Sequence, residues 1–197
     1  MYAQYSHLYD RIPLAATGIV MGSILVLLHL AAILWQDKAV ATLRQTHLKP
    51  QWGALLMCFD FVWIVLLLLK ADWNPLCMPL FTFEHVRPYL LFAAPVVCFV
   101  MCTKSTEHLF ARALGLFILL AAIIPLSAAF LKDPVTRLLI PIWWYPALTV
   151  AMFWVAKPYL LRDWAFWLSR QPVIYKFGAW LGLAYGIAVL CCAILFW

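Results

Sequence analysis

The sequence contains six long apolar stretches, and together they occupy most of its 197 residues. A helix rises about 1.5 Å per residue and the hydrocarbon core of a bilayer is about 30 Å thick, so roughly 20 apolar residues make one crossing. The expected spans are residues 13–35, 52–69, 87–103, 109–131, 138–156 and 177–197. Lipid offers backbone groups no hydrogen-bond partner, and no barrel-like alternation occurs, so each span should be a helix. The pattern therefore predicts an all-α, polytopic membrane helix bundle.

The composition leaves no room for a separate soluble domain. Hydrophobic residues make up 67% of the chain, charged residues only 11%, and the mean hydropathy is +0.95. An ordinary soluble domain carries about 25% charged residues. Because six crossings leave only short connections, we predict one integral-membrane domain covering residues 1–197.

The third span is the weakest of the six. It is short, carries Pro95 near its centre, and is separated from the fourth span only by residues 104–108. A proline removes a backbone donor and disturbs a helix. Five crossings plus one re-entrant segment therefore remain an alternative.

The distribution of basic residues predicts the orientation. Nine lie in or beside the connections after spans one, three and five, with Arg112 in the first turn of the fourth span: Lys38, Arg44, Lys49, Lys104, Arg112, Lys157, Arg162, Arg170 and Lys176. Five lie on the opposite side: Arg11, Lys70, Arg87, Lys132 and Arg137. Lys and Arg accumulate on the cytoplasmic side, so we expect a protein of a bacterial cytoplasmic membrane with both termini on the outer, periplasmic side. Scattered single charges also argue against a nucleic-acid partner, which would require a clustered basic face.

Two connections are expected to be structured. In residues 158–170, apolar side chains share one helical stripe: Leu160, Leu161, Trp164, Trp167 and Leu168. Polar residues occupy the other side: Arg162, Asp163, Ser169 and Arg170. This pattern predicts an interfacial helix anchored by Trp164, Trp167, Arg162 and Arg170. The second connection, residues 71–88, is rich in proline and aromatic residues, and we expect it to fold onto the mouth of the bundle.

Among the Asp, Glu, His, Lys and Arg residues, Asp60 and His29 are the two predicted to lie well inside a span rather than near its end. A carboxylate at the centre of a bilayer costs about 2.5–3.5 kcal/mol on insertion scales, so such a group is often functional. The two residues lie in consecutive antiparallel spans, which makes a direct or water-bridged pair geometrically possible. We interpret Asp60 and His29 as an intramembrane polar site that handles protons or substrate. Interhelical hydrogen bonding by Asp60, and a structural role for His29, are the alternatives.

His29 also offers an alternative cofactor hypothesis, as an axial ligand of haem or of a pigment magnesium. A bis-histidine haem would require a second histidine within a span, and the other four lie in connections or at interfaces. The cofactor therefore stays unknown.

The cysteines give little support for redox or metal chemistry. Cys98 and Cys102 share one helical face, Cys191 and Cys192 are adjacent, and no CxxC motif occurs. Buried cysteine usually acts as a small hydrophobic residue, so we assign no metal site. No catalytic motif is recognisable, and no residue is assigned a catalytic role.

Small residues form the most specific pattern in the chain. Gly178, Gly182 and Gly186 recur every four residues in the last span, and Gly18 and Gly22 form a shorter version in the first. Such stripes let membrane helices approach closely. We predict that these five glycines are helix-packing positions, in contact either within the chain or with another subunit.

These features favour a non-enzymatic subunit of a larger membrane complex devoted to energy transduction or transport. Its partners would be the bilayer and other membrane subunits. The first alternative is a small transporter or permease component that uses Asp60 and His29, and it predicts a polar cavity reaching Asp60. The second is a cofactor enzyme or redox protein that uses His29 or the Cys98 and Cys102 face.

Overall fold

The described part of the chain is built from helices alone. The computed structural model describes residues 12–45, 50–70, 74, 77–78, 80–104, 108–130 and 132–197. Its α-helices are α1 (Leu14–Leu34), α2 (Gln36–Gln45), α3 (Pro50–Leu68), α4 (Arg87–Lys104), α5 (Leu109–Ala121), α6 (Ile123–Ala129), α7 (Leu139–Ala156), α8 (Tyr159–Arg170) and α9 (Pro172–Leu195). Two 3-10 helices, η3 (Phe81–Val86) and η4 (Val135–Leu138), precede α4 and α7. Six helical segments are long and apolar enough to cross a membrane, which confirms that part of the prediction.

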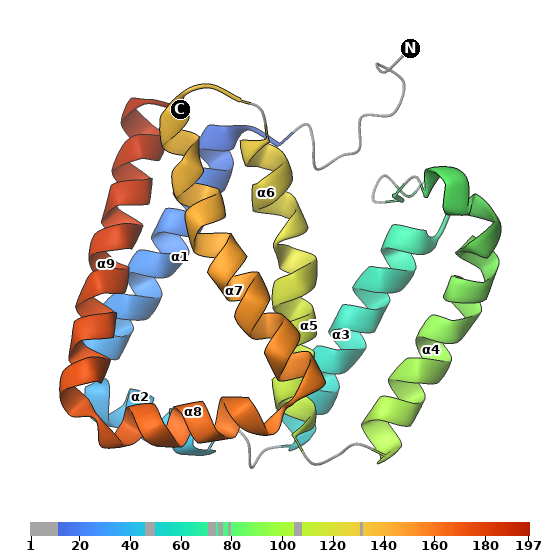
Figure 1. Ribbon diagram of the computed structural model, residues 1–197, viewed down its shortest axis with the longest axis horizontal. Coiled ribbons are helices and arrows are strands. Elements are labelled where there is room, and N and C mark those ends of the chain that lie inside the picture. Colours follow the sequence, from blue (N-terminus) through green and yellow to red (C-terminus); the bar gives the residue numbers. More distant parts are fainter. Residues whose placement is uncertain are drawn as a thin grey trace.

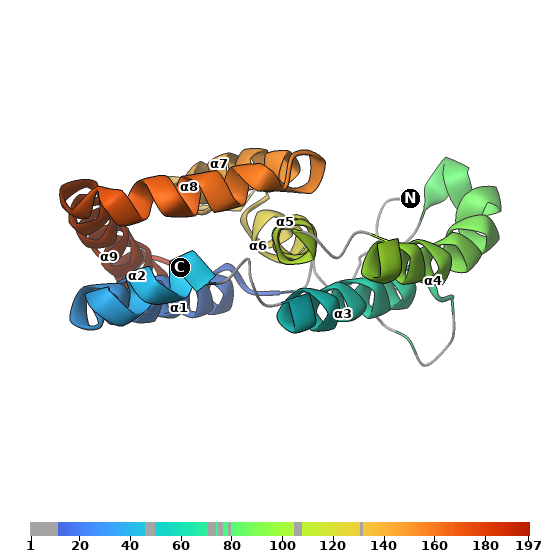
Figure 2. The ribbon, with the colours of Figure 1, turned by 90° about the horizontal axis from the view of Figure 1, so that it is seen from below.

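In Figure 1 the long helical segments run from top to bottom, across the long axis of the molecule, and their connections alternate between the upper and lower sides. α2 and α8 lie across one end rather than alongside the other helices. Seen from below in Figure 2, α1 and α9 lie at one side, α3 and α4 lie at the opposite side, and α5–α6 stands between them. α7 packs mainly on α5. The molecule is therefore divided into an α1–α9 lobe, a central group of α5, α6 and α7, and an α3–α4 arm.

Prolines account for several helix limits. The expected fourth span divides into α5 and α6, because the ring of Pro125 crowds the carbonyl of Ala121, four residues earlier, where α5 ends. Pro172 occupies the first turn of α9, a position that suits proline, and α9 therefore starts five residues before the expected span. α4 contains Pro95 and still runs from Arg87 to Lys104.

α2 is a helix that hydrophobic patterning did not predict. It follows α1 almost directly after Trp35 and is predominantly polar, with the sequence QDKAVATLRQ. It packs against α8 at the same end of the molecule. The span pattern missed it because a short polar helix carries no long apolar stretch.

The most extensive contact between two of the described helices joins α1 to α9. A Cβ atom at Gly22 would lie 3.0 Å from the backbone nitrogen of Leu190, and one at Gly186 would lie 3.0 Å from the backbone nitrogen of Val26. Gly18 lies against Trp197. These glycines allow the two backbones to touch, as helices in lipid require for tight association.

Gly178 differs from the other four glycines, since nothing lies within 4 Å of its Cβ position. The small-residue stripe of α9 is therefore used within the chain from Gly182 onward, and it is open at Gly178.

Candidate functional site

Asp60 lies on the buried side of α3, on the same helical face as Gly53 and Met57. Met57 packs with Leu109 and Ala113 of α5, so this face of α3 is turned toward α5. The Asp60 side chain is fully buried, and neither carboxylate oxygen has a hydrogen-bond partner among the described residues. A buried polar group without hydrogen bonds destabilises a fold, so Asp60 is an anomaly in this interface.

Aromatic side chains flank the same interface. Phe59 and Trp63 of α3 have ring centroids 5.8 Å apart, and each lies 6.2 Å from the ring of Phe117 on α5. With no exposed surface of its own, Asp60 does not line a route to solvent.

His29 is used in the packing of α1 against α9. Its Nδ1 lies 2.8 Å from the backbone oxygen of Leu25. A carbonyl can only accept, so Nδ1 carries the proton and donates. The imidazole occupies the space that a Cβ at Gly182 would fill, and Trp143 packs edge-on at a centroid distance of 6.3 Å. His29 therefore contacts α9 and α7 rather than α3.

The surroundings of His29 do not fit a haem or chlorin ligand. Nδ1 is occupied by Leu25, and Nε2 is the atom nearest the Cβ position of Gly182. An axial ligand must present a free nitrogen to a planar ring, and here the backbone of α9 occupies that direction.

The expected pair of His29 and Asp60 is not formed. α1 packs mainly on α9, α6 and α2, whereas α3 packs on α5 and α4. Figures 1 and 2 show α5–α6 between α1 and α3 along the long axis of the molecule. The two ionisable residues are consecutive in sequence order but belong to different parts of the molecule.

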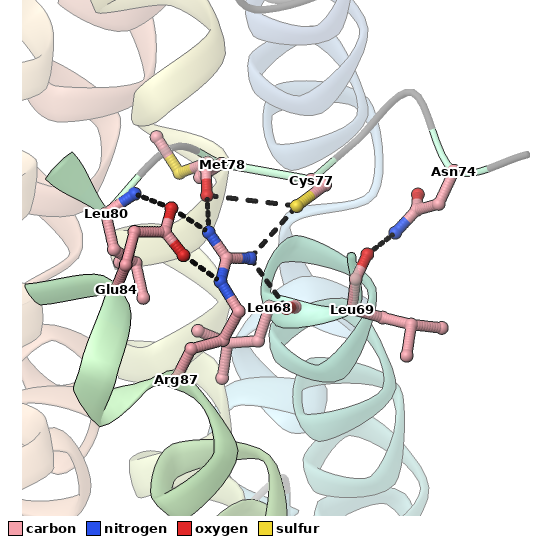
Figure 3. A network of polar contacts seen from close by, with 8 residues as sticks. All are labelled: Leu68, Leu69, Asn74, Cys77, Met78, Leu80, Glu84 and Arg87. Atoms are coloured by element: carbon pink, nitrogen blue, oxygen red, sulfur yellow. Dashed lines mark hydrogen bonds and ion pairs between the residues drawn. The ribbon is translucent and has the colours of Figure 1, made fainter. Parts of the chain in front are cut away.

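The densest polar cluster surrounds Arg87, at the start of α4, as Figure 3 shows. Its Nε and Nη2 each donate to a carboxylate oxygen of Glu84 at 2.8 Å. Nη1 donates to the Leu68 carbonyl at 2.7 Å and to Cys77 Sγ at 3.0 Å, and Nη2 also donates to the Met78 carbonyl at 2.6 Å. A cation at the carbonyl end of α3 is favoured by the helix dipole. All three guanidinium nitrogens are therefore engaged in holding the connection between α3 and α4.

Asn74 closes the same end of α3 from the other side. Its Nδ2 donates to the carbonyls of Leu66 and Leu69 at 2.6 and 2.7 Å. The described parts of the 71–88 connection thus lie against the end of α3, whereas residues 71–73, 75–76 and 79 lie outside the described residues. In the sequence analysis Arg87 was only one of fourteen basic residues. The available signal for an ion pair was the three-residue spacing between Glu84 and Arg87.

Three thiols meet between α3 and α4. The sulfur atoms of Cys58, Cys98 and Cys102 all lie within 4.8 Å of one another. Cys98 and Cys102 are one helical turn apart on α4, and Cys58 reaches them from α3. We name these three residues the thiol cluster. The sequence analysis identified Cys98 and Cys102 as a pair on one helical face. It missed Cys58, because the sequence of one helix does not show how that helix is aligned with another.

The four expected anchors lie on α8. Leu161 and Ala165 are the buried residues of this helix, whereas Trp164 and Trp167 are half exposed. Arg162 pairs with Asp163 at 2.9 Å in an exposed position, and Arg170 lies in the last turn. A groove of about 890 Å³ lies beside α8, lined by residues of α5, α7 and α8 that include Trp143, Trp154 and Trp164.

No known protein family matches the chain, and no curated protein or solved structure is significantly similar to it.

Proposed function

We propose that this protein is a non-enzymatic integral-membrane subunit that packs within a larger membrane complex. The observation that carries the proposal is the incomplete covering of the arm formed by α3 and α4. In the most apolar stretch of residues 83–103, 11% of the residues are buried, the same share as in residues 135–156 and a third of the 33% in residues 109–129. The helices on which α4 packs extensively are α3 and η3.

A helix in lipid gains nothing from burying apolar surface alone, since lipid tails are equally apolar. α4 nevertheless presents large aromatic side chains to its surroundings, with Phe92 exposed to 76% and Tyr89 to 74%. Aromatic side chains are enriched at the centres of protein interfaces. A membrane helix of a partner subunit would give this face the packing that the chain itself does not supply.

The polar groups of the described spans support a structural rather than a chemical role. His29 is committed to the α1–α9 contact and Arg87 to the end of α3. An enzyme needs polar groups that converge on a reactive position, and these two lie in separate parts of the molecule.

The proposal includes a location in the bacterial cytoplasmic membrane. α2 and α8 lie at one end of the molecule, which the charge bias assigns to the cytoplasm. There α8 would rest in the headgroup region, with Trp164 and Trp167 directed to the acyl chains and Arg162 and Arg170 to the lipid phosphates. Both termini would then face the periplasm.

Site-specific photocrosslinking in native membranes tests the proposal. A photoreactive residue at Phe92 should crosslink to one defined protein, whereas the same residue at Leu27 of α1, exposed to 64%, should label only lipid. The complex should also run larger than the monomer after extraction in a mild detergent. A stable monomer without any protein crosslink at Phe92 would overturn the proposal.

The buried carboxyl group of Asp60 is the observation that favours the transporter alternative. Reconstitution of the purified protein into vesicles separates the two functions. A subunit without transport activity should give the same proton flux with Asp60 and with Asp60→Asn, whereas a flux that the substitution abolishes would establish a transporter.

A further inference from the structure

The thiol cluster places three potential soft metal ligands close together. Cys58 lies on α3, and Cys98 and Cys102 lie on α4, so the cluster exists only when the two helices pack in this register. Two thioethers lie close by, since Cys98, Cys102 and Met101 pack against the apolar cluster that contains Met57. All three thiols are free rather than joined in a disulfide.

The spacing of the sulfurs fits a single metal ion. With a metal–thiolate bond of about 2.3 Å, three sulfurs placed around one ion lie about 4 Å apart. The thiol cluster has its sulfurs within 4.8 Å, so small side-chain rotations bring them to that distance. The cluster therefore needs no movement of α3 or α4 to close around an ion.

The ligand type selects the ion. Thiolate and thioether ligands prefer soft ions such as Cu(I), whereas structural zinc is almost always held by four ligands in a tetrahedron. The cluster supplies three thiols, and no fourth His, Cys, Asp or Glu ligand joins them among the described residues. A three-sulfur site of this kind suits Cu(I) better than Zn(II).

Charge and access also fit a monovalent ion. When two of the thiols lose their protons on binding, Cu(I) and its ligands carry a net charge of −1. The guanidinium of Arg112 on α5 places a positive charge beside α4, because its Nη1 lies 3.9 Å from Met101 Sδ. Cys102 also lies only about 3 Å along the axis from the end of α4 at Lys104, so an ion can enter from the aqueous side.

We propose that Cys58, Cys98 and Cys102 form a binding site for one Cu(I) ion between α3 and α4. The site is contained within this chain and needs no partner subunit. It extends beyond the proposed assembly role, because it gives the arm a ligand as well as a packing surface.

Anaerobic titration of the full-length protein in detergent tests the site. Cu(I) is supplied in complex with a competing chelator of known affinity, and bound copper is measured by elemental analysis. We expect one Cu(I) per chain with the natural sequence. Replacing Cys58, Cys98 and Cys102 by serine together should abolish binding, and each single replacement should lower the affinity about tenfold or more.

Two sets of variants keep the test decisive. Cys191→Ser with Cys192→Ser removes two thiols from α9 and should leave copper binding unchanged. Cys58→Met keeps a soft sulfur and should retain more affinity than Cys58→Ser, which a purely structural effect would not produce. Circular dichroism and gel filtration of every variant confirm that the fold is intact.

X-ray absorption at the copper edge gives an independent readout. It should show sulfur neighbours at about 2.3 Å, with fewer of them in Cys58→Ser. Any of three results would overturn the proposal: no copper above the triple variant, copper that follows Cys191 and Cys192, or a preference for Zn(II) in the same competition.

Discussion

The α1–α9 pair and the α3–α4 pair are both formed by apolar helices, but different residues hold them together. In the α1–α9 pair, glycines remove side chains so that the two backbones make contact along the length of the helices. In the α3–α4 pair, α4 has no glycine, and the links are the Arg87 cluster at one end and the thiol cluster further along. The first interface is continuous packing, and the second depends on a few polar or soft groups.

This difference shows two ways of joining helices where apolar burial gives no driving force. Close backbone packing gains dispersion energy over a large area and tolerates no added volume. A polar link can be strong but leaves most of each helix surface free for another occupant. The α1–α9 pair should therefore be rigid and insensitive to ligands, whereas the α3–α4 pair should respond to partners and ions.

Filling the glycine contact should have the largest effect on stability. Gly22→Leu places a side chain against the backbone of Leu190 and Gly186, and we expect a loss of about 3 kcal/mol or more in the free energy of unfolding. The measurement is reversible unfolding in mixed micelles. Gly178→Leu is the matched control, because its Cβ position is open, and it should change stability by less than about 0.5 kcal/mol. Equal effects of the two substitutions would refute the distinction between these glycines.

Breaking the Arg87 cluster should come next. Arg87→Leu leaves the carbonyls of Leu68 and Met78 without their guanidinium donor, and the expected loss is about 2 kcal/mol. Limited proteolysis should show faster cleavage between α3 and α4, with α1 and α9 unaffected. Arg162→Leu breaks an exposed pair with Asp163 and should change stability by less than about 0.5 kcal/mol. If cleavage between α3 and α4 is no faster in Arg87→Leu, the guanidinium is not the link we describe.

Removing the buried carboxyl group should stabilise the arm. Asp60→Leu keeps the shape of the side chain and eliminates two oxygens that have no described partner, so we expect a gain of about 1–2 kcal/mol. Asp60→Asn keeps a buried polar group and should give no comparable gain. Thermal unfolding of the three proteins in the same detergent makes the comparison. A loss of stability in Asp60→Leu would show that Asp60 has a polar partner, which points to a second subunit or a bound ion.

The smallest effect should come from a single hydrogen bond between α1 and α9. The hydroxyl of Tyr175 donates to the Ala32 carbonyl at 3.1 Å, and Tyr175→Phe removes only this bond. Interhelical hydrogen bonds in membrane proteins average about 0.6 kcal/mol, so the expected loss is of that size. A loss above about 2 kcal/mol would mean that hydrogen bonding, rather than glycine packing, holds this pair together.

The sequence predicted the number of apolar helices well, because length and hydropathy are properties of each segment alone. It predicted helix pairing less well. Asp60 and His29 were expected to be neighbours because their helices follow one another in the chain, but α1 packs on α9. The glycine pattern was the better guide to helix pairing, because the small-residue stripes on α1 and α9 indicated two helix surfaces that can pack closely.

The candidate sites were predictable only in part. Asp60 was found because a carboxyl group in an apolar span is conspicuous, although its lack of a partner needed coordinates. The thiol cluster and the Arg87 cluster depend on the register between α3 and α4 and on the path of their connection. No periodicity within a single helix contains that information, because it arises from the contact between two surfaces.

The contact of the first span with the last sets the order in which the protein can be completed. A ribosome delivers α1 to the membrane long before α9 is synthesised, so the face of α1 around Gly18 and Gly22 is exposed to lipid while the four spans between α1 and α9 are inserted. During that interval α3 and α4 can already meet. The arm is thus available to the proposed ion and the proposed partner during translation, and the α1–α9 contact forms only when α9 arrives.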